Sequence, residues 1–199
     1  MSASKQILLK PIDNRAARRI LDKRHPLGCG APFRFAFGVE YEGYIEGVLT
    51  FGGPTVNTAV TRWALAQHEV LELRKMWCSD KLPRNSESRA LAISLRLIRR
   101  HFHGVALLLT YCDDDEKATA YKAAGWTACE AHRYVREVLV GGKWLSVRDA
   151  NRYRVTDQAT AKRYETRRKW LIGVDERGKK IASEVQIAAR VITNDEGAV

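Results

Sequence analysis

The sequence predicts a mixed α+β fold, with a central mixed, mostly antiparallel sheet flanked by helices and a basic C-terminal extension. Strand-like runs of alternating or continuous apolar residues are separated by segments whose apolar residues recur at helical spacing. Glycine-containing turns separate neighbouring strands. After residue 147 the chain becomes strongly basic. We therefore expect a main domain over residues 1–147 and a basic extension over residues 148–199 that packs on it.

The N-terminal third of the chain predicts a strand, a helix and a hairpin. Gln6–Leu9 is a short apolar run that indicates a strand. Four apolar residues follow at helical spacing and predict a helix; they are Ile12, Ala16, Ile20 and Leu21. Phe33–Phe51 alternates on both sides of Glu42-Gly43, which is typical of an antiparallel hairpin. Trp63–His68 is expected to form a single helical turn.

The middle of the chain predicts strands alternating with helices. Residues 69–79 indicate a strand, and the helix after it has apolar residues at i, i+4, i+7 and i+11, namely Leu91, Leu95, Ile98 and Phe102. Residues 104–113 are almost continuously apolar, as expected for a strand covered on both faces. Residues 113–126 predict a short helix ended by Gly125. Residues 126–147 predict strands around a Gly-Gly turn.

The charge favours a polyanionic partner. The chain has 34 Lys and Arg against 23 Asp and Glu, a net charge of +11, and a net +6 of this lies within residues 148–180. Tyr153, Tyr164 and Trp170 are interleaved with these charges and are available to stack on bases or to pack. The alternative is a solvated helix followed by a strand that returns to the sheet.

No membrane association is expected. No apolar run reaches the roughly 18 residues of a membrane span, and the first residues lack the apolar region of a signal peptide. We therefore expect a cytoplasmic protein. The four cysteines have no paired spacing, which favours buried free thiols over a zinc site or a disulfide framework.

Several segments resemble those of known families. "AYKAAGW", residues 120–126, resembles the Tyr-x-x-x-Gly-[Phe/Trp] ending of the last helix in GNAT acyltransferases, and the order of the expected elements is similar to theirs. "LELRKMWCSDKLPRNSESRALAISLRLIRRH", residues 71–101, closely resembles the central block of the phage Mom family, which has a GNAT-like core. The hairpin residues 37–54 and the segment 110–126 also resemble that family.

The Mom resemblance implies a transferase that converts the exocyclic amine of adenine in phage DNA to its carbamoylmethyl derivative and so hides restriction sites. Residues 1–147 would then form a GNAT-like catalytic domain acting on double-stranded DNA in the host cytoplasm, with a DNA contact in residues 148–199. Because such an enzyme must take the base out of the stack, Arg34 and Trp63 are further candidate DNA contacts. The oligomeric state, a homodimer included, stays open.

Two other functions compete with this one. The first is a conventional coenzyme A-dependent N-acetyltransferase that acts on a small amine or a protein. The second is a DNA-binding protein of the GNAT fold that has lost catalysis. The group donor is acetyl-CoA or another small molecule.

A polar segment precedes the predicted helix of residues 86–101. In GNAT enzymes the equivalent loop carries glycines whose backbone N–H groups hold a pyrophosphate at a helix N-terminus. Here the glycines are missing, and the candidate cofactor-binding residues are Arg84, Asn85, Ser86, Ser88 and Arg89. Helix capping explains one or two of these residues. The surplus of guanidinium and hydroxyl groups predicts an anion site.

Four residues are candidates for the chemistry. Tyr121 matches the GNAT tyrosine that protonates a leaving thiolate, although a core aromatic is the competing interpretation. Tyr111 and Asp113 end a strand on the same face, and Asp113 would serve as a base, a metal ligand or an N-cap. Glu72 is a second candidate base, or a partner of Arg84 or Arg89 in a structural ion pair.

The Mom resemblance also implies iron. His25 precedes Pro26 in a loop where members of that family carry a histidine. His25, Asp113 and a tyrosine would provide a nitrogen and oxygen ligand set for such a metal.

Overall fold

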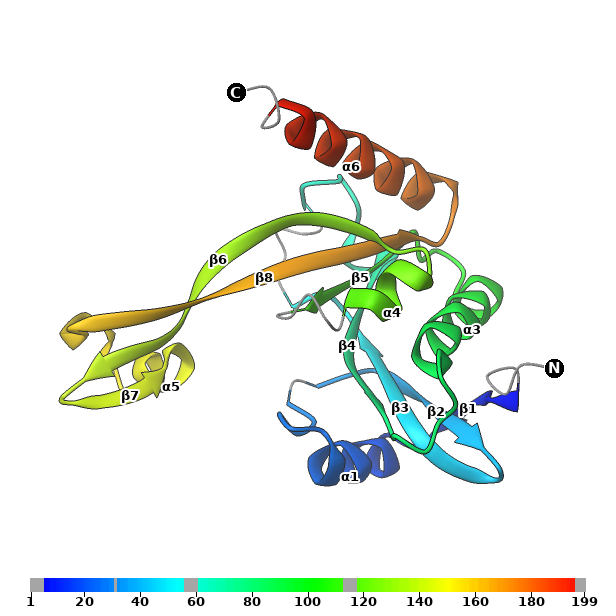
Figure 1. The fold of residues 1–199 in the computed structure, drawn as a ribbon, viewed down its shortest axis with the longest axis horizontal. Helices are drawn as coiled ribbons and strands as arrows, with labels where there is room; N and C mark the ends of the chain where they lie inside the picture. Colours follow the sequence, from blue (N-terminus) through cyan, green and yellow to red (C-terminus); the bar gives the residue numbers. More distant parts are fainter. Residues whose placement is uncertain (1–5, 31, 56–60, 113–117, 196–199) are drawn as a thin grey trace.

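A computed structural model describes residues 6–30, 32–55, 61–112 and 118–195 of the chain (Figure 1). Its strands are β1 Leu8–Ile12, β2 Phe35–Tyr41, β3 Tyr44–Gly52, β4 Val70–Cys78, β5 Leu107–Cys112, β6 Thr127–Val140, β7 Lys143–Ser146 and β8 Ala161–Gly173. Its helices are α1 Asn14–Arg24, α3 Ser86–His101, α4 Ala118–Ala123, α5 Val147–Arg152 and α6 Glu176–Asp195, with 3-10 turns η2 Gln67–Glu69 and η3 Thr156–Gln158.

The strands form one sheet in the order β1-β2-β3-β4-β5-β8-β6-β7. Of its neighbouring pairs, β4 and β5 are parallel and the others are antiparallel. This confirms the predicted mixed, mostly antiparallel sheet. The β4–β5 pairing extends only from Val70–Glu72 to Leu107–Leu109, and beyond it the two strands separate. The sheet is therefore open at the carboxyl ends of these two strands.

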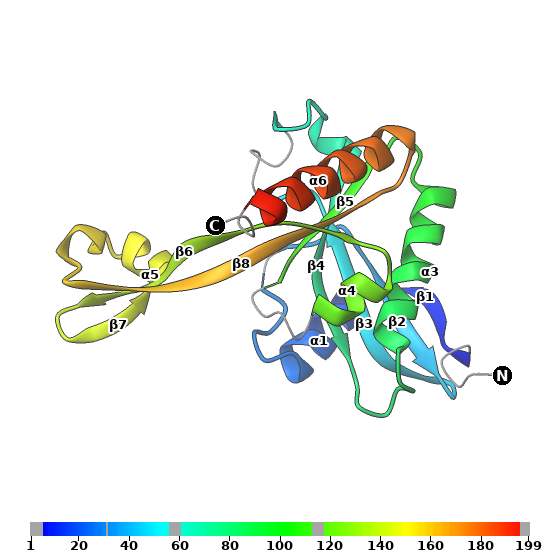
Figure 2. The ribbon, with the colours of Figure 1, turned by 45° about the horizontal axis from the view of Figure 1, so that its top comes forward.

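Helices cover both faces of the sheet. Helices α3 and α4 pack with Leu71, Leu73 and Leu108 in the largest apolar cluster. The alternate residues Val70 of β4 and Leu107 of β5 pack with α6, and Val48 of β3 packs with α1. Because alternate residues of a strand point to opposite faces, α1 and α6 share the face opposite to α3 and α4 (Figure 2).

Helical periodicity predicted α3 well and α1 only in part. Leu91, Leu95 and Ile98 are buried as expected. The inclusion of Ile12 in the first helix was wrong, because Ile12 ends β1. The helix starts one residue after Asp13, whose carboxylate accepts the backbone N–H groups of Arg15 and Ala16 at 2.8 and 3.1 Å. Such an N-cap fixes the start of a helix regardless of the apolar residues before it.

The two predicted turns are confirmed. The β2–β3 hairpin turns at Glu42-Gly43. The β6–β7 turn uses Gly141 and Gly142, both at positive φ (56° and 79°). A two-residue hairpin turn with positive φ at both positions follows the right-handed twist of the strands, and glycine adopts it without steric cost.

The basic segment returns to the sheet. Its strand β8 lies between β5 and β6, so residues 161–173 of the expected extension are part of the sheet; the division at residue 147 stays a prediction. Strand β5 pairs with β8 only as far as Cys112 and Arg168. Beyond that point β6 and β8 continue together and carry β7 and α5 at their far end (Figure 1). We call residues 131–168 the arm.

Within the described residues, no helix has both the length and the apolar character needed to cross a membrane.

Candidate functional site

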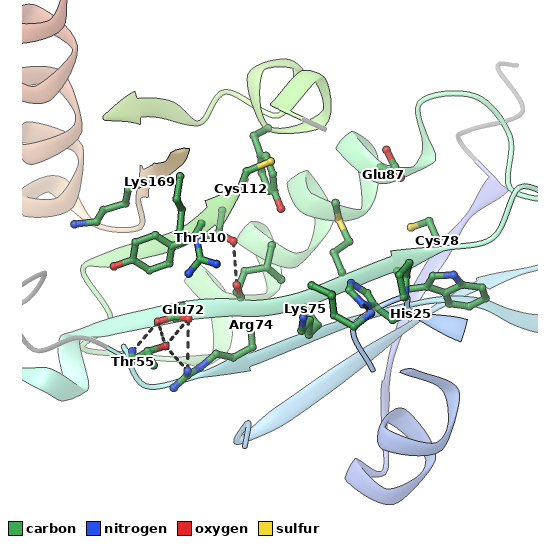
Figure 3. Close-up of a pocket in the computed structure, with 18 of the residues that line it drawn as sticks. His25, Thr55, Glu72, Arg74, Lys75, Cys78, Glu87, Thr110, Cys112 and Lys169 are labelled. Atoms are coloured by element: carbon green, nitrogen blue, oxygen red, sulfur yellow. Dashed lines mark hydrogen bonds and ion pairs between the residues drawn. The ribbon is translucent and has the colours of Figure 1, made fainter. Parts of the chain in front are cut away.

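A cavity of about 770 Å³ lies where β4 and β5 separate (Figure 3). Its volume is within the usual range for small-molecule sites. Its walls come from β4, β5, β8, the end of α1 with the loop after it, Glu87 of α3 and Tyr121 of α4. A bulge helps to shape it, because Arg74 has no partner in β3 between the pairs Thr50–Lys75 and Phe51–Leu73. Bulges of this kind re-aim side chains next to active sites.

The structure brings four of the predicted site residues together and separates others from them. Glu72, Tyr111, Tyr121 and His25 line the cavity. The five predicted cofactor-binding residues do not line it, although Glu87 from the same segment does. Asp113, predicted as a catalytic residue and a metal ligand, lies outside the described residues.

Glu72 is buried and firmly held. Its carboxylate accepts the backbone N–H and the hydroxyl of Thr55, each at 2.7 Å. Its ion-pair partner is the Arg74 guanidinium at 3.5 Å, and the predicted alternative of a pair with Arg84 or Arg89 is not the one formed. Arg74 also donates to the Thr55 hydroxyl (Figure 3) and to the Gly53 carbonyl. The carboxylate is therefore oriented by these contacts and adjacent to the cavity.

Tyr111 lies near Glu72 in the same cavity. Burial raises the pKa of its phenol, the Glu72 carboxylate raises it further, and the Arg167 guanidinium opposes the shift. The phenol is consequently protonated at neutral pH and is suited to donate a hydrogen bond.

Tyr121 fits both interpretations of the sequence, a core aromatic and a proton donor. It belongs to the core, where its ring stacks on Trp170 with centroids 6.0 Å apart and meets Trp126 edge-on at 5.6 Å. It also lines the cavity. Burial raises its pKa, against a lowering by the hydrogen bond with Thr110. A buried phenol that holds its proton can act as a proton donor.

The polar segment before α3 forms a tight local structure. Ser86 is buried and its hydroxyl donates to the Pro83 carbonyl at 2.6 Å, while the Ser88 hydroxyl donates to the Asn85 carbonyl at 3.1 Å. Asn85 is the N-cap residue at φ 68°, and its side chain makes no capping hydrogen bond. Arg84 is exposed and Arg89 is half-buried. The hydroxyls are thus used locally, and the first-turn N–H groups receive no side-chain cap.

This helix end partly fits an anionic cofactor. Uncapped N–H groups and the positive end of the helix dipole favour an anion, and Arg84 and Arg89 add positive charge. The exposed Glu87 carboxylate in the first turn opposes it. The donor set suits one phosphate or carboxylate group better than a doubly charged pyrophosphate.

The iron prediction rests on His25. This histidine lines the cavity, and its Nδ1 accepts the backbone N–H of Leu27 at 3.1 Å. That bond occupies Nδ1, so a metal bound by this histidine would have to be held through Nε2. In the described parts of the chain, no three His, Cys, Asp or Glu side chains are grouped closely enough to hold a metal ion. The ligand set with Asp113 stays a prediction.

Sequence reasoning missed several cavity residues; they are Thr55, Arg74, Cys78, Arg167 and Lys169. The alternating pattern that predicted the strand around Glu72 also includes its neighbours in that strand. A bulge such as the one at Arg74 cannot be predicted from alternation. Arg167 and Lys169 lie in the basic segment, and their i, i+2 spacing was the available signal for a strand. Thr55 reaches the site through the loop after β3, which carries no pattern.

Of the aromatic residues predicted to stack or pack, Trp170 packs. It is 2% exposed and lies in the core. Tyr153 and Tyr164 are exposed by 63% and 46%. Trp63 lies beside the cavity, with the Lys169 ammonium 5.3 Å from its ring centroid.

Sequence comparison relates the chain to one family. The model of the Mom protein family matches residues 6–182. The methylcarbamoylase mom of Escherichia phage Mu is 33% identical over 76 residues, which cover 37% of this chain and 31% of the relative. The matched region thus covers about a third of the length of this curated relative.

Structure comparison identifies the fold as that of GNAT acetyltransferases. An acetyltransferase of the GNAT family from Streptococcus pneumoniae matches with a TM-score of 0.52 and 8% identity, over 85% of this chain and 99% of that one. The ribosomal-protein-S18-alanine N-acetyltransferase from Escherichia coli matches with 0.52 and 12%, over 85% and 94%. The Salmonella typhimurium protein yncA, solved with acetyl-CoA, matches with 0.54 and 11%, over 86% and 95%. The predicted GNAT-like fold is confirmed.

Proposed function

Because this chain belongs to the Mom protein family, we propose that it is a GNAT-fold transferase that modifies adenine in phage DNA. The exocyclic amine of adenine receives a carbamoylmethyl group, and the modified DNA is protected from restriction. The family match across residues 6–182 carries the proposal. The relative named methylcarbamoylase supports the reaction type. Host cytoplasm is the compartment in which such a protein would act.

The reaction is a substitution at the methylene carbon of the transferred group. One N–H bond of the adenine amine and the bond from the donor's methylene carbon to its leaving group break, while an N–C bond forms. The proton lost by the amine balances the proton gained by the leaving group. The enzyme therefore needs a base on the adenine side and an acid on the donor side.

Glu72 and Tyr121 are the pair we assign to these roles. The Glu72 carboxylate is oriented by Thr55 and Arg74 and lines the cavity, so it would accept the proton of the amine. Tyr121 lines the same cavity from the α4 side and holds its proton because burial raises its pKa. Tyr111, also protonated, would donate a hydrogen bond to the base or to the transferred amide.

The opening between β4 and β5 would let these groups act from opposite faces of the sheet. Glu72 shares the face of Val70, which packs with α6, whereas Tyr121 belongs to the cluster that contains α3 and α4. An adenine removed from the DNA stack would enter beside Glu72, and the donor would enter beside Tyr121 and α3. The base must leave the duplex because its amine is otherwise unreachable.

The donor stays open within one chemical class, a small molecule that carries the group on a leaving group. Its anionic part would be held by the first-turn N–H groups of α3 with Arg84 and Arg89. Iron, as the family resemblance implies, would be held by Nε2 of His25 and by Asp113 and would act as a Lewis acid.

A coenzyme A-dependent N-acetyltransferase is the second candidate function. The GNAT fold and the protonated Tyr121 in the cavity favour it. In that reaction a small amine or a protein amine would attack the acetyl thioester, and the coenzyme thiolate would leave with the Tyr121 proton. The Glu87 carboxylate beside the expected pyrophosphate position speaks against it.

The test is to express the chain in a bacterium, digest the genomic DNA to nucleosides and measure deoxyadenosine by mass spectrometry. We expect a new nucleoside heavier than deoxyadenosine by one carbamoylmethyl group in place of hydrogen, and its absence in the Glu72→Gln variant. Unmodified DNA from cells that contain folded protein would refute the proposal. Acetylation of amines by the purified chain with acetyl-CoA would favour the alternative.

A further inference from the structure

One face of β8 leads from the arm into the cavity. Arg163, Glu165, Arg167 and Lys169 are alternate residues of β8, so their side chains lie on the same face of the strand. Glu165 pairs with Arg136 and accepts a hydrogen bond from the Tyr134 hydroxyl at 2.8 Å. We call the three cations, Arg163, Arg167 and Lys169, the cationic face. Arg167 and Lys169 line the cavity. At about 3.3 Å per residue, Arg163 lies about 20 Å from Lys169 along the strand.

Each residue of the cationic face is held against an aromatic ring. The Arg163 guanidinium lies 4.0 Å from the Trp144 ring centroid, and Arg167 lies 4.7 Å from that of Tyr134. The Lys169 ammonium lies 5.3 Å from the Trp63 centroid and 5.7 Å from that of Tyr111. Cation–π contacts position the charged groups without neutralising them. Arg163 also pairs with the Glu137 carboxylate at 3.2 Å, and because its side chain is 57% exposed this surface pair is weak.

Lys169 is a half-buried cation in an electrostatically unfavourable position. Burial lowers the pKa of its ammonium, and the nearby Arg62 charge lowers it too. No carboxylate among the described residues forms an ion pair with it. A half-buried cation beside a second positive charge is relieved by binding a phosphate.

Charge alone does not choose between the two faces of the arm, because Arg133, Lys162 and Arg168 lie on the other one. The two faces differ in how far they are covered by other elements and in whether they continue to the cavity. Val138, which pairs with Lys162 and shares its face, is buried, and α5 packs on β6 and β7 there. Trp170, on the same face as Lys162, is buried beneath Tyr121. The cationic face is the one that reaches the Glu72 side of the cavity.

We infer that the cationic face is the DNA-binding track of the arm, on which Arg163, Arg167 and Lys169 contact backbone phosphates of a duplex and guide the target adenine toward Glu72. The inference rests on the proposed function for the identity of the polyanion. The arm has ten Lys or Arg and four Asp or Glu between residues 131 and 168. Phosphate contacts by side chains of this kind position a protein on DNA without specifying sequence.

The arm contains a matched control. Arg133 is exposed and lies 4.2 Å from the Tyr164 ring centroid, just as Arg163 lies over Trp144. Both arginines belong to the two-stranded ribbon, but they project from opposite faces, since Arg133 pairs with Thr166. Changing either one to alanine removes one positive charge and one stacking contact. Arg163→Ala also removes the ion pair with Glu137, and Arg163→Lys, which can keep that pair, controls for this difference.

The experiment measures binding of the full chain to a fluorescently labelled 20-base-pair duplex by anisotropy, across a range of salt concentrations. We expect Arg163→Ala to weaken binding about 5- to 20-fold and to reduce the slope of log K against log salt by about one. Arg163→Lys should retain most of the affinity, and Arg133→Ala should change it less than about 2-fold. Melting temperatures of all variants provide the folding check.

Equal losses for Arg133→Ala and Arg163→Ala, or no loss for Arg163→Ala, would overturn the inference. The result is separable from the test of the proposed function, because binding is read without modification. Face-dependent binding with unmodified nucleosides would refute the proposed function and leave the binding track standing. Modified DNA together with face-independent binding would do the reverse.

Discussion

The Thr55 hydroxyl lies 2.7 Å from both carboxylate oxygens of Glu72, and the Thr55 backbone N–H donates to the same carboxylate. This arrangement fixes the orientation of the carboxylate from inside the protein. The same carboxylate lines the cavity, so these bonds set the direction from which it can accept a proton.

Glu72→Gln should abolish modification while the fold is retained. Glutamine keeps the size of the side chain but cannot accept the amine proton, and loss of a general base costs about 10²- to 10⁴-fold in rate. Because Arg74 loses its ionic partner, we expect a cost of about 1–3 kcal/mol in the free energy of unfolding. Glu69→Gln is the control, since Glu69 pairs with Arg177 at 2.6 Å and is not part of the cavity lining. Full activity in the Glu72 variant would remove it from the chemistry.

Substitutions at the start of α3 should distinguish a residue that stabilises the fold from one that binds the donor. Ser86→Ala removes a buried hydroxyl bonded to Pro83 and should lower the free energy of unfolding by about 1 kcal/mol. Arg84 is exposed, so Arg84→Ala should leave the melting temperature unchanged and raise the KM for the donor. Thermal melts and kinetics at several donor concentrations distinguish the two effects. An unchanged KM in Arg84→Ala would argue against an anion site at this helix end.

Cys78 should make the protein sensitive to alkali. Burial, with the Glu87 charge, raises its pKa to about 12 from 9.0. The folded thiol therefore holds its proton more tightly than the unfolded one, so its contribution to stability is complete below pH 9 and is lost as pH rises toward 12. Urea denaturation at pH 8 and pH 10, under reducing conditions, should show a smaller loss for Cys78→Ala than for the unmodified chain. Equal losses would mean that the thiol titrates normally.

Replacing Trp170 with alanine should destabilise the fold far more than replacing Tyr153, because Trp170 lies in the core and Tyr153 lies on the surface. Trp170→Ala is expected to cost about 3–5 kcal/mol, because it opens a cavity beneath Tyr121. Tyr153→Ala, at a residue that is 63% exposed, should stay within about 0.5 kcal/mol of the original stability. Chemical denaturation measures both. A mild effect at Trp170 would contradict its place in the core.

The sequence was sufficient for elements with a strong period and insufficient for contacts that cross the sheet. Leu91, Leu95 and Ile98 predicted α3 because one helix face is buried against a single sheet face. Strand β8 was harder to predict, because its outer half, including Lys162 and Arg163, is solvated and reads as a charge run. Only its end, from Trp170, is packed on both faces.

The location of the site could be predicted from the sequence, but the hydrogen bonds and ion pairs within it could not. Tyr111 near the end of β5 and Glu72 near the start of β4 were predicted site residues, and both line the cavity. The partner of Glu72 was expected in the polar loop, whereas the bulge at Arg74 and the loop holding Thr55 supply it. Both depend on register shifts and loop geometry that no periodic pattern records.

The position of β8 also determines when the protein can fold. Strands β5 and β6 precede it in the chain by roughly fifty and thirty residues but meet only through it. Until Gly173 has left the ribosome, each presents an unpaired edge, and such edges favour aggregation. Sequence-distant pairing of this kind also slows folding. Truncation before residue 161 should therefore yield an insoluble product instead of a smaller working domain.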